Sequence, residues 1–217
     1  MNEIKKAVAL AALAYVKQGD IIGLGSGEML DCFIDSLDNI KEKIKGAVVS
    51  NKESAQKLEK LGIDVFQANE VTSLDLYIDT ADEINVLNEM VKGESSALTC
   101  GAVLGAMAKR TLILVTESQQ VPLLGKFPVP VEVIPMARSY VARELFKLGG
   151  DPSYRENGIT ENGNVILDLH NLEILDAKAL ALQIKAIAGV VGVGLFTKAN
   201  PDIVLVGDAS GVTSITE

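Results

Sequence analysis

The sequence predicts an α/β protein, in which a parallel sheet domain with helices on both faces is joined to a smaller ferredoxin-like α+β domain. Two observations lead to this fold class. Over residues 1–115, short apolar runs alternate with segments of helical periodicity, which is typical of a parallel sheet covered on both faces. After a proline-containing break at Lys126–Pro130, the order becomes strand, helix, strand, strand, helix, strand, which is the ferredoxin-like plan.

The first domain is expected to begin with an amphipathic helix, because apolar residues from Ile4 to Tyr15 fall on one helical face and Gly19 stands where a helix would end. Strands and helices then alternate along the chain. Strands are expected at Ile21–Gly25, Ala47–Ser50, Leu74–Asp79 and Thr111–Val115, and helices at Glu28–Leu37, Asn51–Leu61 and Ala97–Lys109.

The second domain is expected to span residues 129–199, and residues 1–128 and 200–217 are expected to form the Rossmann-like first domain. Asn162-Gly163 is a hairpin turn signal, and Ile203–Gly207 is expected to be a strand that returns to the first domain. The second domain's elements are expected at Val131–Ile134, Ala137–Leu148, Ser153–Arg155, Val165–Leu169, Ala177–Ile187 and Val190–Phe196.

Composition excludes several classes of partner. The net charge of −9 disfavours binding to nucleic acid and to anionic membrane surfaces, and no run is long enough to span a bilayer. Cys32 and Cys100 form neither a disulfide framework nor a metal motif, so a reducing, cytoplasmic location without a metal or other cofactor is expected. Lys5 and Lys6 precede an apolar run that imitates a signal peptide only weakly, and an amphipathic helix is the simpler interpretation.

Three stretches carry a resemblance to a known family: Ile78–Asn85 (IDTADEIN), Leu124–Arg138 (LGKFPVPVEVIPMAR) and Asn162–Asp168 (NGNVILD). They closely resemble ribose-5-phosphate isomerase type A, and the similarity runs nearly end to end. The resemblance implies a two-domain fold, a homodimer, no metal, and a small-molecule substrate. It also implies transfer of a proton between C1 and C2 of an open-chain aldose phosphate, which requires a carboxylate base, an oxyanion donor and a phosphate cradle.

The expected phosphate cradle is the loop Gly25-Ser26-Gly27, which joins a strand to a helix and would present N–H groups to an anion. The family follows this loop with Ser-Thr, whereas this chain has Glu28 and Met29. A carboxylate at the helix N-terminus would compete with phosphate for the same site, so weak phosphate binding is expected. Alternatively, Glu28 only stabilises the helix.

Two further loops resemble the family's pocket. Asp79 and Asp82 match its two aspartates, with Thr80 in place of a glycine between them, and Lys92-Gly93 match its pocket lysine and the glycine after it. Glu94 and Ser95 replace glycines that border the substrate. By spacing alone, the acidic turn is equally well a polar turn at a strand end, and Lys92 a surface lysine.

Gly101 stands at the position where the resemblance expects the family's glutamate, which acts as the base. Cys100 and Ala102 replace the basic residues on either side, and Gln119 replaces another pocket lysine. Loss of a general base typically costs a factor of about 10² to 10⁴ in rate. Native isomerase activity is therefore expected to be lost.

The altered positions gather in one predicted pocket, which indicates a repurposed or engineered site on an intact scaffold. Met29, Leu30, Val86 and Leu87 are expected to make it more apolar. Two hypotheses remain open. In the first, the protein is an enzyme, either a crippled isomerase or a repurposed catalyst for an apolar substrate. Such a catalyst would use Glu28 or Glu94 as a desolvated base with a raised pKa, Lys92 as a Schiff-base former or Cys100 as a nucleophile. In the second, the protein is a binding protein or inert scaffold without turnover.

Overall fold

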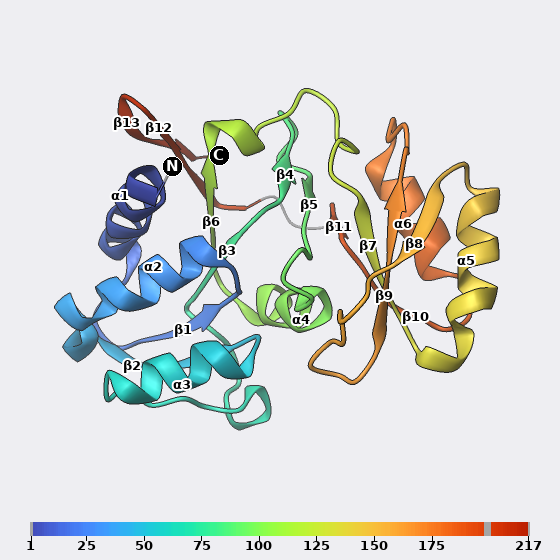
Figure 1. The fold of residues 1–217 in the computed structure, drawn as a ribbon. Coiled ribbons are helices and arrows are strands. Elements are labelled where there is room, and N and C mark those ends of the chain that lie inside the picture. Colours follow the sequence, from blue (N-terminus) through green and yellow to red (C-terminus); the bar gives the residue numbers. More distant parts are fainter. Residues whose placement is uncertain (1, 198–200, 217) are drawn as a thin grey trace. The chain divides into compact units, whose positions relative to one another are not determined.

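The computed structural model describes residues 2–197 and 201–216 (Figure 1). Contacts divide the chain into two compact units. Unit 1 comprises Met1–Thr80, Cys100–Ser118 and Pro201–Glu217, and unit 2 comprises Ala81–Thr99 and Gln119–Asn200. By this division residues 81–99 and 119–128 group with the second unit, whereas the predicted domains place them in the first.

Unit 1 is built on a six-stranded sheet of order β13-β12-β6-β3-β1-β2. Every pairing from β2 to β12 is parallel, and only the edge strand β13 runs antiparallel to its neighbour. The strands are β1 (Asp20–Leu24), β2 (Ile44–Val49), β3 (Leu76–Thr80), β6 (Thr111–Thr116), β12 (Ile203–Asp208) and β13 (Gly211–Thr216).

Helices cover both faces of this sheet (Figure 1). Phe33 of α2 and Val8 of α1 belong to the core cluster formed with Ile22 and Ile78, which lie on one face, and α3 adds Leu58 to the same cluster. On the other face Leu104 of α4 packs with Tyr77. The helices are α1 (Asn2–Ala12), α2 (Glu28–Ser36), α3 (Lys52–Lys60) and α4 (Leu98–Met107), with 3-10 turns at Leu13–Tyr15, Leu37–Asn39, Lys41–Lys43, Ala68–Glu70 and Glu117–Gln119.

Unit 2 contains a four-stranded antiparallel sheet of order β10-β7-β9-β8. This order, with the two helices between the strand pairs, is the ferredoxin-like plan, so the predicted fold class is confirmed. The elements are β7 (Val129–Val133), a 3-10 turn at Pro135–Ala137, α5 (Arg138–Lys147), β8 (Asp151–Tyr154), β9 (Val165–His170), α6 (Ala177–Lys185) and β10 (Val190–Val193).

A small three-stranded sheet in unit 2 was not predicted. It consists of β4 (Glu83–Ile84), β5 (Met90–Val91) and β11 (Leu195–Phe196), in the order β11-β5-β4. The predicted strand Val190–Phe196 is therefore interrupted at Gly194. Its N–H donates to Pro130 O (2.7 Å), and a Cβ at this position would lie 2.4 Å from Lys92 O, so the chain passes between the two sheets where only glycine fits.

Most predicted elements agree with the structure to within a few residues, with two further differences. Gly19 has φ +84° in the turn before β1, but it does not end the first helix, which continues as a 3-10 turn to Tyr15. The strand β13 was missed. Among the described residues, no helix is both long and apolar enough to cross a membrane.

Candidate functional site

The glycine-rich loop of unit 1 joins β1 to α2, as the sequence predicts. Gly27 precedes the helix with φ +122°, and Ser26 is buried. A Cβ at Gly25 would lie 1.9 Å from Asp79 Oδ1, so glycine is required here because the Asp79 carboxylate lies against its backbone. A Cβ at Gly27 would lie 3.5 Å from Thr80 Cγ2. The structure therefore brings Gly25, Gly27, Asp79 and Thr80 together at the carboxyl end of the parallel strands.

The Glu28 side chain is turned toward α1, where its carboxylate accepts a hydrogen bond from Lys5 Nζ. The side chain is 80% exposed. The hydrogen bond and the charge of Lys5 lower the pKa of Glu28 below its ordinary value. The prediction of a desolvated base with a raised pKa is therefore wrong for Glu28, because an exposed carboxylate beside an ammonium group favours its charged form.

Asp79 is a buried carboxylate held by its own strand. Tyr77 Oη donates a hydrogen bond to Asp79 Oδ2, and Thr80 N donates to Asp79 Oδ1 at 2.8 Å. Burial and the neighbouring negative charge of Asp79 raise the pKa of Tyr77 well above its ordinary value, so the phenol remains a donor. Sequence reasoning missed Tyr77. The sequence could have indicated it, because Tyr77 is two residues before Asp79 and residues two apart in a strand lie on the same face.

Gly101 lies on α4, directly against this pair. A Cβ built at Gly101 would be 2.9 Å from Tyr77 Oη and 3.5 Å from Asp79 Oδ2. The position where the resemblance expects a glutamate thus carries no side chain, and the phenol and carboxylate occupy the space beside it. The neighbouring Cys100 is half-buried.

Unit 2 holds the second group of predicted residues. Asp82 lies just before β4, and Lys92, Gly93, Glu94 and Ser95 follow β5. Asp82 Oδ2 accepts from Glu94 N at 3.0 Å. Burial, opposed by backbone N–H groups and by Lys92, raises the pKa of Asp82 to about 6. Lys92 is itself buried, with Nζ 4.9 Å from the centre of the Phe196 ring, so it is not the surface lysine that spacing alone would allow.

The remaining predicted pocket residues lie elsewhere than expected. Glu94 and Ser95 are exposed at the tip of their turn, so the prediction that Glu94 is desolvated is wrong. The prediction of an apolar pocket lining is also wrong. Met29 and Leu30 belong to the core of unit 1 because they face inward from α2, while Val86 and Leu87 project from an exposed turn closed by Asn85.

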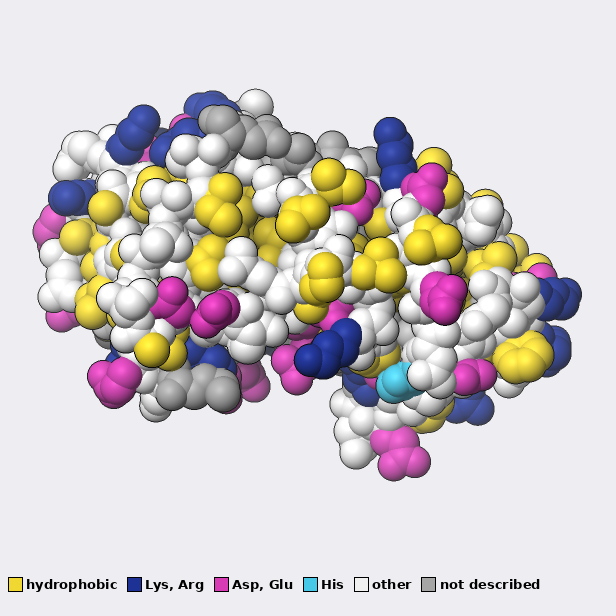
Figure 2. All heavy atoms as spheres, turned by 90° about the horizontal axis from the view of Figure 1, so that it is seen from above, with side chains coloured by type: hydrophobic (Ala, Val, Ile, Leu, Met, Phe, Trp, Pro, Cys, Tyr) yellow, Lys and Arg dark blue, Asp and Glu magenta, His cyan; other side chains and the backbone are white. Residues whose placement is uncertain are grey.

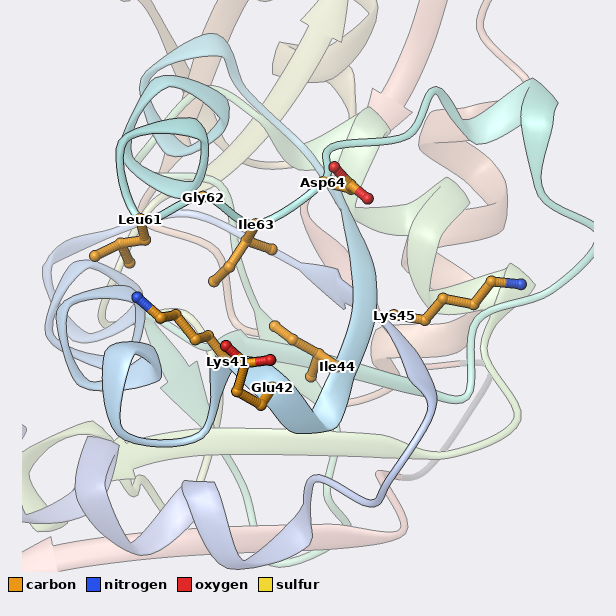
Figure 3. Close-up of a pocket in the computed structure, with 8 residues that line it drawn as sticks. All are labelled: Lys41, Glu42, Ile44, Lys45, Leu61, Gly62, Ile63 and Asp64. Atoms are coloured by element: carbon orange, nitrogen blue, oxygen red, sulfur yellow. The ribbon is translucent and has the colours of Figure 1, made fainter.

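A surface pocket of about 320 Å³ in unit 1 contains none of the predicted site residues (Figure 3). It lies between the start of β2 and the segment that follows α3. Figure 3 shows isoleucine and leucine side chains around the hollow and charged groups at its rim. The lining residues are Lys41, Glu42, Ile44, Lys45, Leu61, Gly62, Ile63 and Asp64.

Two observations bear on metals and polyanions. Within residues 2–197 and 201–216, no group of three His, Cys, Asp or Glu side chains is arranged to hold a metal ion. On the face shown in Figure 2, the described Lys and Arg side chains are dispersed among acidic and apolar ones rather than joined in a continuous basic stripe.

Comparisons with known proteins agree with this fold. The family model described as ribose 5-phosphate isomerase A (phosphoriboisomerase A) matches residues 46–211. The ribose 5-phosphate isomerase A of Neisseria gonorrhoeae is 36% identical, with a TM-score of 0.96 over 99% of this chain and 96% of that one. The enzyme of Methanocaldococcus jannaschii is 35% identical, with a TM-score of 0.93 over 99% of each chain. A D-ribose-5-phosphate isomerase in complex with phospho-erythronic acid is 30% identical, with a TM-score of 0.94 over 99% and 98%.

Proposed function

The chain belongs to the ribose 5-phosphate isomerase A family, and we propose that it is a member that binds a small molecule but has lost ribose 5-phosphate isomerisation. The observation that carries the proposal is Gly101. Isomerisation through an enediolate needs a base that removes a proton next to the carbonyl, and this position has no side chain to provide one. A base is worth about 10² to 10⁴ in rate.

Asp79 is a poor substitute for the missing base. Its two oxygens accept from Tyr77 Oη and Thr80 N, and its carboxylate lies against the backbone of Gly25. The environment of Asp79 therefore supports a structural and ligand-orienting role.

The charge balance beside the glycine loop supports weak binding of phosphate. Lys5 would be an attractive cation for an anion at the N-terminus of α2, but Glu28 accepts its hydrogen bond and offsets its charge. A phosphate at this helix end would also meet the repulsion of Glu28 itself. A ligand with less negative charge than a phosphate monoester suits the loop better.

A second candidate function rests on Asp82. A carboxyl group with a pKa of about 6 is suited to act as a general base near neutral pH, and the buried Lys92 is one of the groups that influence it. This arrangement supports catalysis on a different substrate. Dependence of a newly found activity on Asp82, tested with Asp82→Asn, separates this candidate from a binding protein without turnover.

The proposal is tested by exchange of the substrate's C2 hydrogen with solvent. Ribose 5-phosphate incubated with the protein in D₂O should show no incorporation of deuterium at C2 by NMR, while the Neisseria gonorrhoeae isomerase run in parallel should label this position rapidly. Labelling at a comparable rate would overturn the proposal, because it would show that some group of this chain removes the proton.

The family and the composition also support a homodimer in the cytoplasm as part of this proposal. Large apolar side chains are exposed on unit 2, among them Met136 (91%) and Leu175 (83%), which is consistent with a surface that is covered in an oligomer.

A further inference from the structure

Arg155 connects two parts of unit 2 that are far apart in sequence. It follows β8, in the loop that leads to β9, and its side chain is only 18% exposed. Nε donates to Asp168 Oδ2 at 2.8 Å, and Nη2 donates to Asp168 Oδ1, so the two side chains form a two-point pair. The third nitrogen, Nη1, points away from this pair.

Nη1 donates to the turn Gly93–Ser96, about sixty residues earlier in the chain. Its acceptors are Gly93 O at 2.8 Å, Glu94 O at 3.0 Å and Ser96 Oγ at 3.4 Å. All three guanidinium nitrogens thus face protein acceptors. Arg155 is therefore committed to the protein and is not placed to bind a ligand through its charge.

The backbone of the turn Gly93–Ser96 has an unfavourable conformation, so contacts from outside the turn are needed to stabilise it. Gly93 has φ +134°, and Ser96 has φ +64°, a left-handed conformation that costs a non-glycine residue roughly 1 kcal/mol or more. The hydrogen bond from Ser96 N to Gly93 O, at 3.1 Å, closes the turn from within. The same Gly93 oxygen accepts from Arg155, so the arginine reinforces the contact that defines the turn.

We propose that Arg155 is a positioning residue, which together with Asp168 holds the turn Gly93–Ser96 so that the Glu94 N–H is presented to Asp82. With the carbonyls of Gly93 and Glu94 turned toward the guanidinium, the Glu94 N–H donates to Asp82 Oδ2 at 3.0 Å. That the positioned turn aids ligand binding at Asp82 and Lys92 rests on the proposed function. That Arg155 holds the turn in place does not.

The loop that carries Arg155 is anchored independently. The buried carboxylate of Glu132 on β7 accepts hydrogen bonds at Oε1 from Thr160 Oγ1 (2.9 Å), Asn162 Nδ2 (3.0 Å) and Asn164 Nδ2 (2.8 Å). Arg155 N also donates to Ile166 O at 3.0 Å. Because the backbone of Arg155 is fixed in this way, its guanidinium can hold the turn Gly93–Ser96 in place.

The test compares Arg155→Lys and Asp168→Asn with the control Arg138→Lys. Lysine keeps the charge but cannot reach two partners in a plane, and Asp168→Asn weakens the pair from the other side. Arg138 is a matched control because its guanidinium lies 4.8 Å from the ring of Tyr154, on the strand that leads to Arg155, and its charge is likewise retained.

Two NMR measurements on the ligand-free protein distinguish a loss of positioning of the Glu94 N–H from a general loss of stability. Exchange of the Glu94 amide hydrogen should become at least tenfold faster in both test variants and stay unchanged in the control. The Glu94 amide proton shift should follow the titration of Asp82 in the parent, and the amplitude of this response should fall by half or more in the test variants. Lys92 and Glu94 are the charged groups that influence Asp82, and both are retained in all variants.

Unchanged exchange and an undiminished response in a folded Arg155→Lys would overturn the proposal, even if the melting temperature fell. If Arg155→Lys does not fold, the same two results in Asp168→Asn would overturn it. Because neither readout involves a ligand or turnover, failure of the proposed function leaves this test intact.

Discussion

Asp82 is a residue whose environment makes stability depend on pH. Burial raises its pKa to about 6, from an ordinary value of 3.8. As pH rises, the unfolded chain loses this proton first, so the folded state becomes progressively less stable between about pH 4 and pH 6. Above about pH 6 the buried Asp82 carboxylate is charged, and the loss of folded-state stability persists.

Asp82→Asn should therefore raise the free energy of unfolding at pH 8 by about 1–3 kcal/mol and should change it little at pH 4. Urea denaturation at the two pH values measures the difference, with Asp35→Asn on the exposed side of α2 as the control for net charge. Equal effects of Asp82→Asn at both pH values would contradict the assigned environment.

Glu28 determines the charge near the glycine loop, because it adds a negative charge and pairs with Lys5. Glu3 is the matched control residue for testing this. Both carboxylates are exposed and both pair with a lysine, since Lys6 Nζ donates to Glu3 Oε1 at 3.4 Å. Glu28→Gln should strengthen binding of inorganic phosphate by about fivefold, because it removes a unit charge and releases Lys5. Glu3→Gln makes the same change of net charge within α1 and should have no such effect.

Calorimetric titration with phosphate at constant ionic strength measures both variants. Indistinguishable affinities for the two variants would show that Glu28 does not control the loop. The substitution of Met29 is avoided because its side chain is part of the core of unit 1.

At the scale of elements, the contact between α4 and β3 decides which residue can stand at position 101. Alanine in a helix interior is favoured over glycine by roughly 0.5–1 kcal/mol. At Gly101 this gain is opposed by the approach of the new Cβ to Tyr77 Oη at 2.9 Å. At Gly105, one turn later, a Cβ would lie 3.5 Å from the Tyr77 ring, which is an ordinary contact.

Gly105→Ala should therefore stabilise the protein by roughly 0.5–1 kcal/mol, whereas Gly101→Ala should be neutral or destabilising. Tyr77→Phe removes the opposing oxygen, so Gly101→Ala should recover its gain in that background. A double-mutant cycle by urea denaturation should give a coupling energy of at least about 0.5 kcal/mol. Additive effects would show that the phenol does not restrict this position.

The parallel strands and long helices could be predicted from sequence because their periodicity is strong and extends over many residues. The strands β4 and β5 could not, since two residues define no period, and β13 combines a glycine with mostly exposed residues. The glycine loop, the acidic turn and Gly101 were identified by resemblance. The contacts that define their chemistry were not, because Lys5 and Glu28 are 23 residues apart and Arg155 and Gly93 are 62 apart.

For the whole molecule, the family and the exposed apolar side chains of unit 2 lead us to expect a homodimer. Light scattering coupled to size exclusion should give a mass of twice the 23.0 kDa of the chain. The mass should persist at high salt, because an interface that depends on apolar burial is not screened by ions. A monomer at micromolar concentration would contradict this expectation.

The central claim is that the family's scaffold is retained while its isomerisation is lost with the base at position 101. The most direct measurement is kcat/KM for conversion of ribose 5-phosphate to ribulose 5-phosphate, with the Neisseria gonorrhoeae isomerase assayed beside it. The missing side chain at Gly101 predicts a value at least several hundred-fold below that of the reference enzyme, or no detectable turnover. A value within tenfold of the reference enzyme would contradict the claim and show that another group of this chain performs the proton transfer.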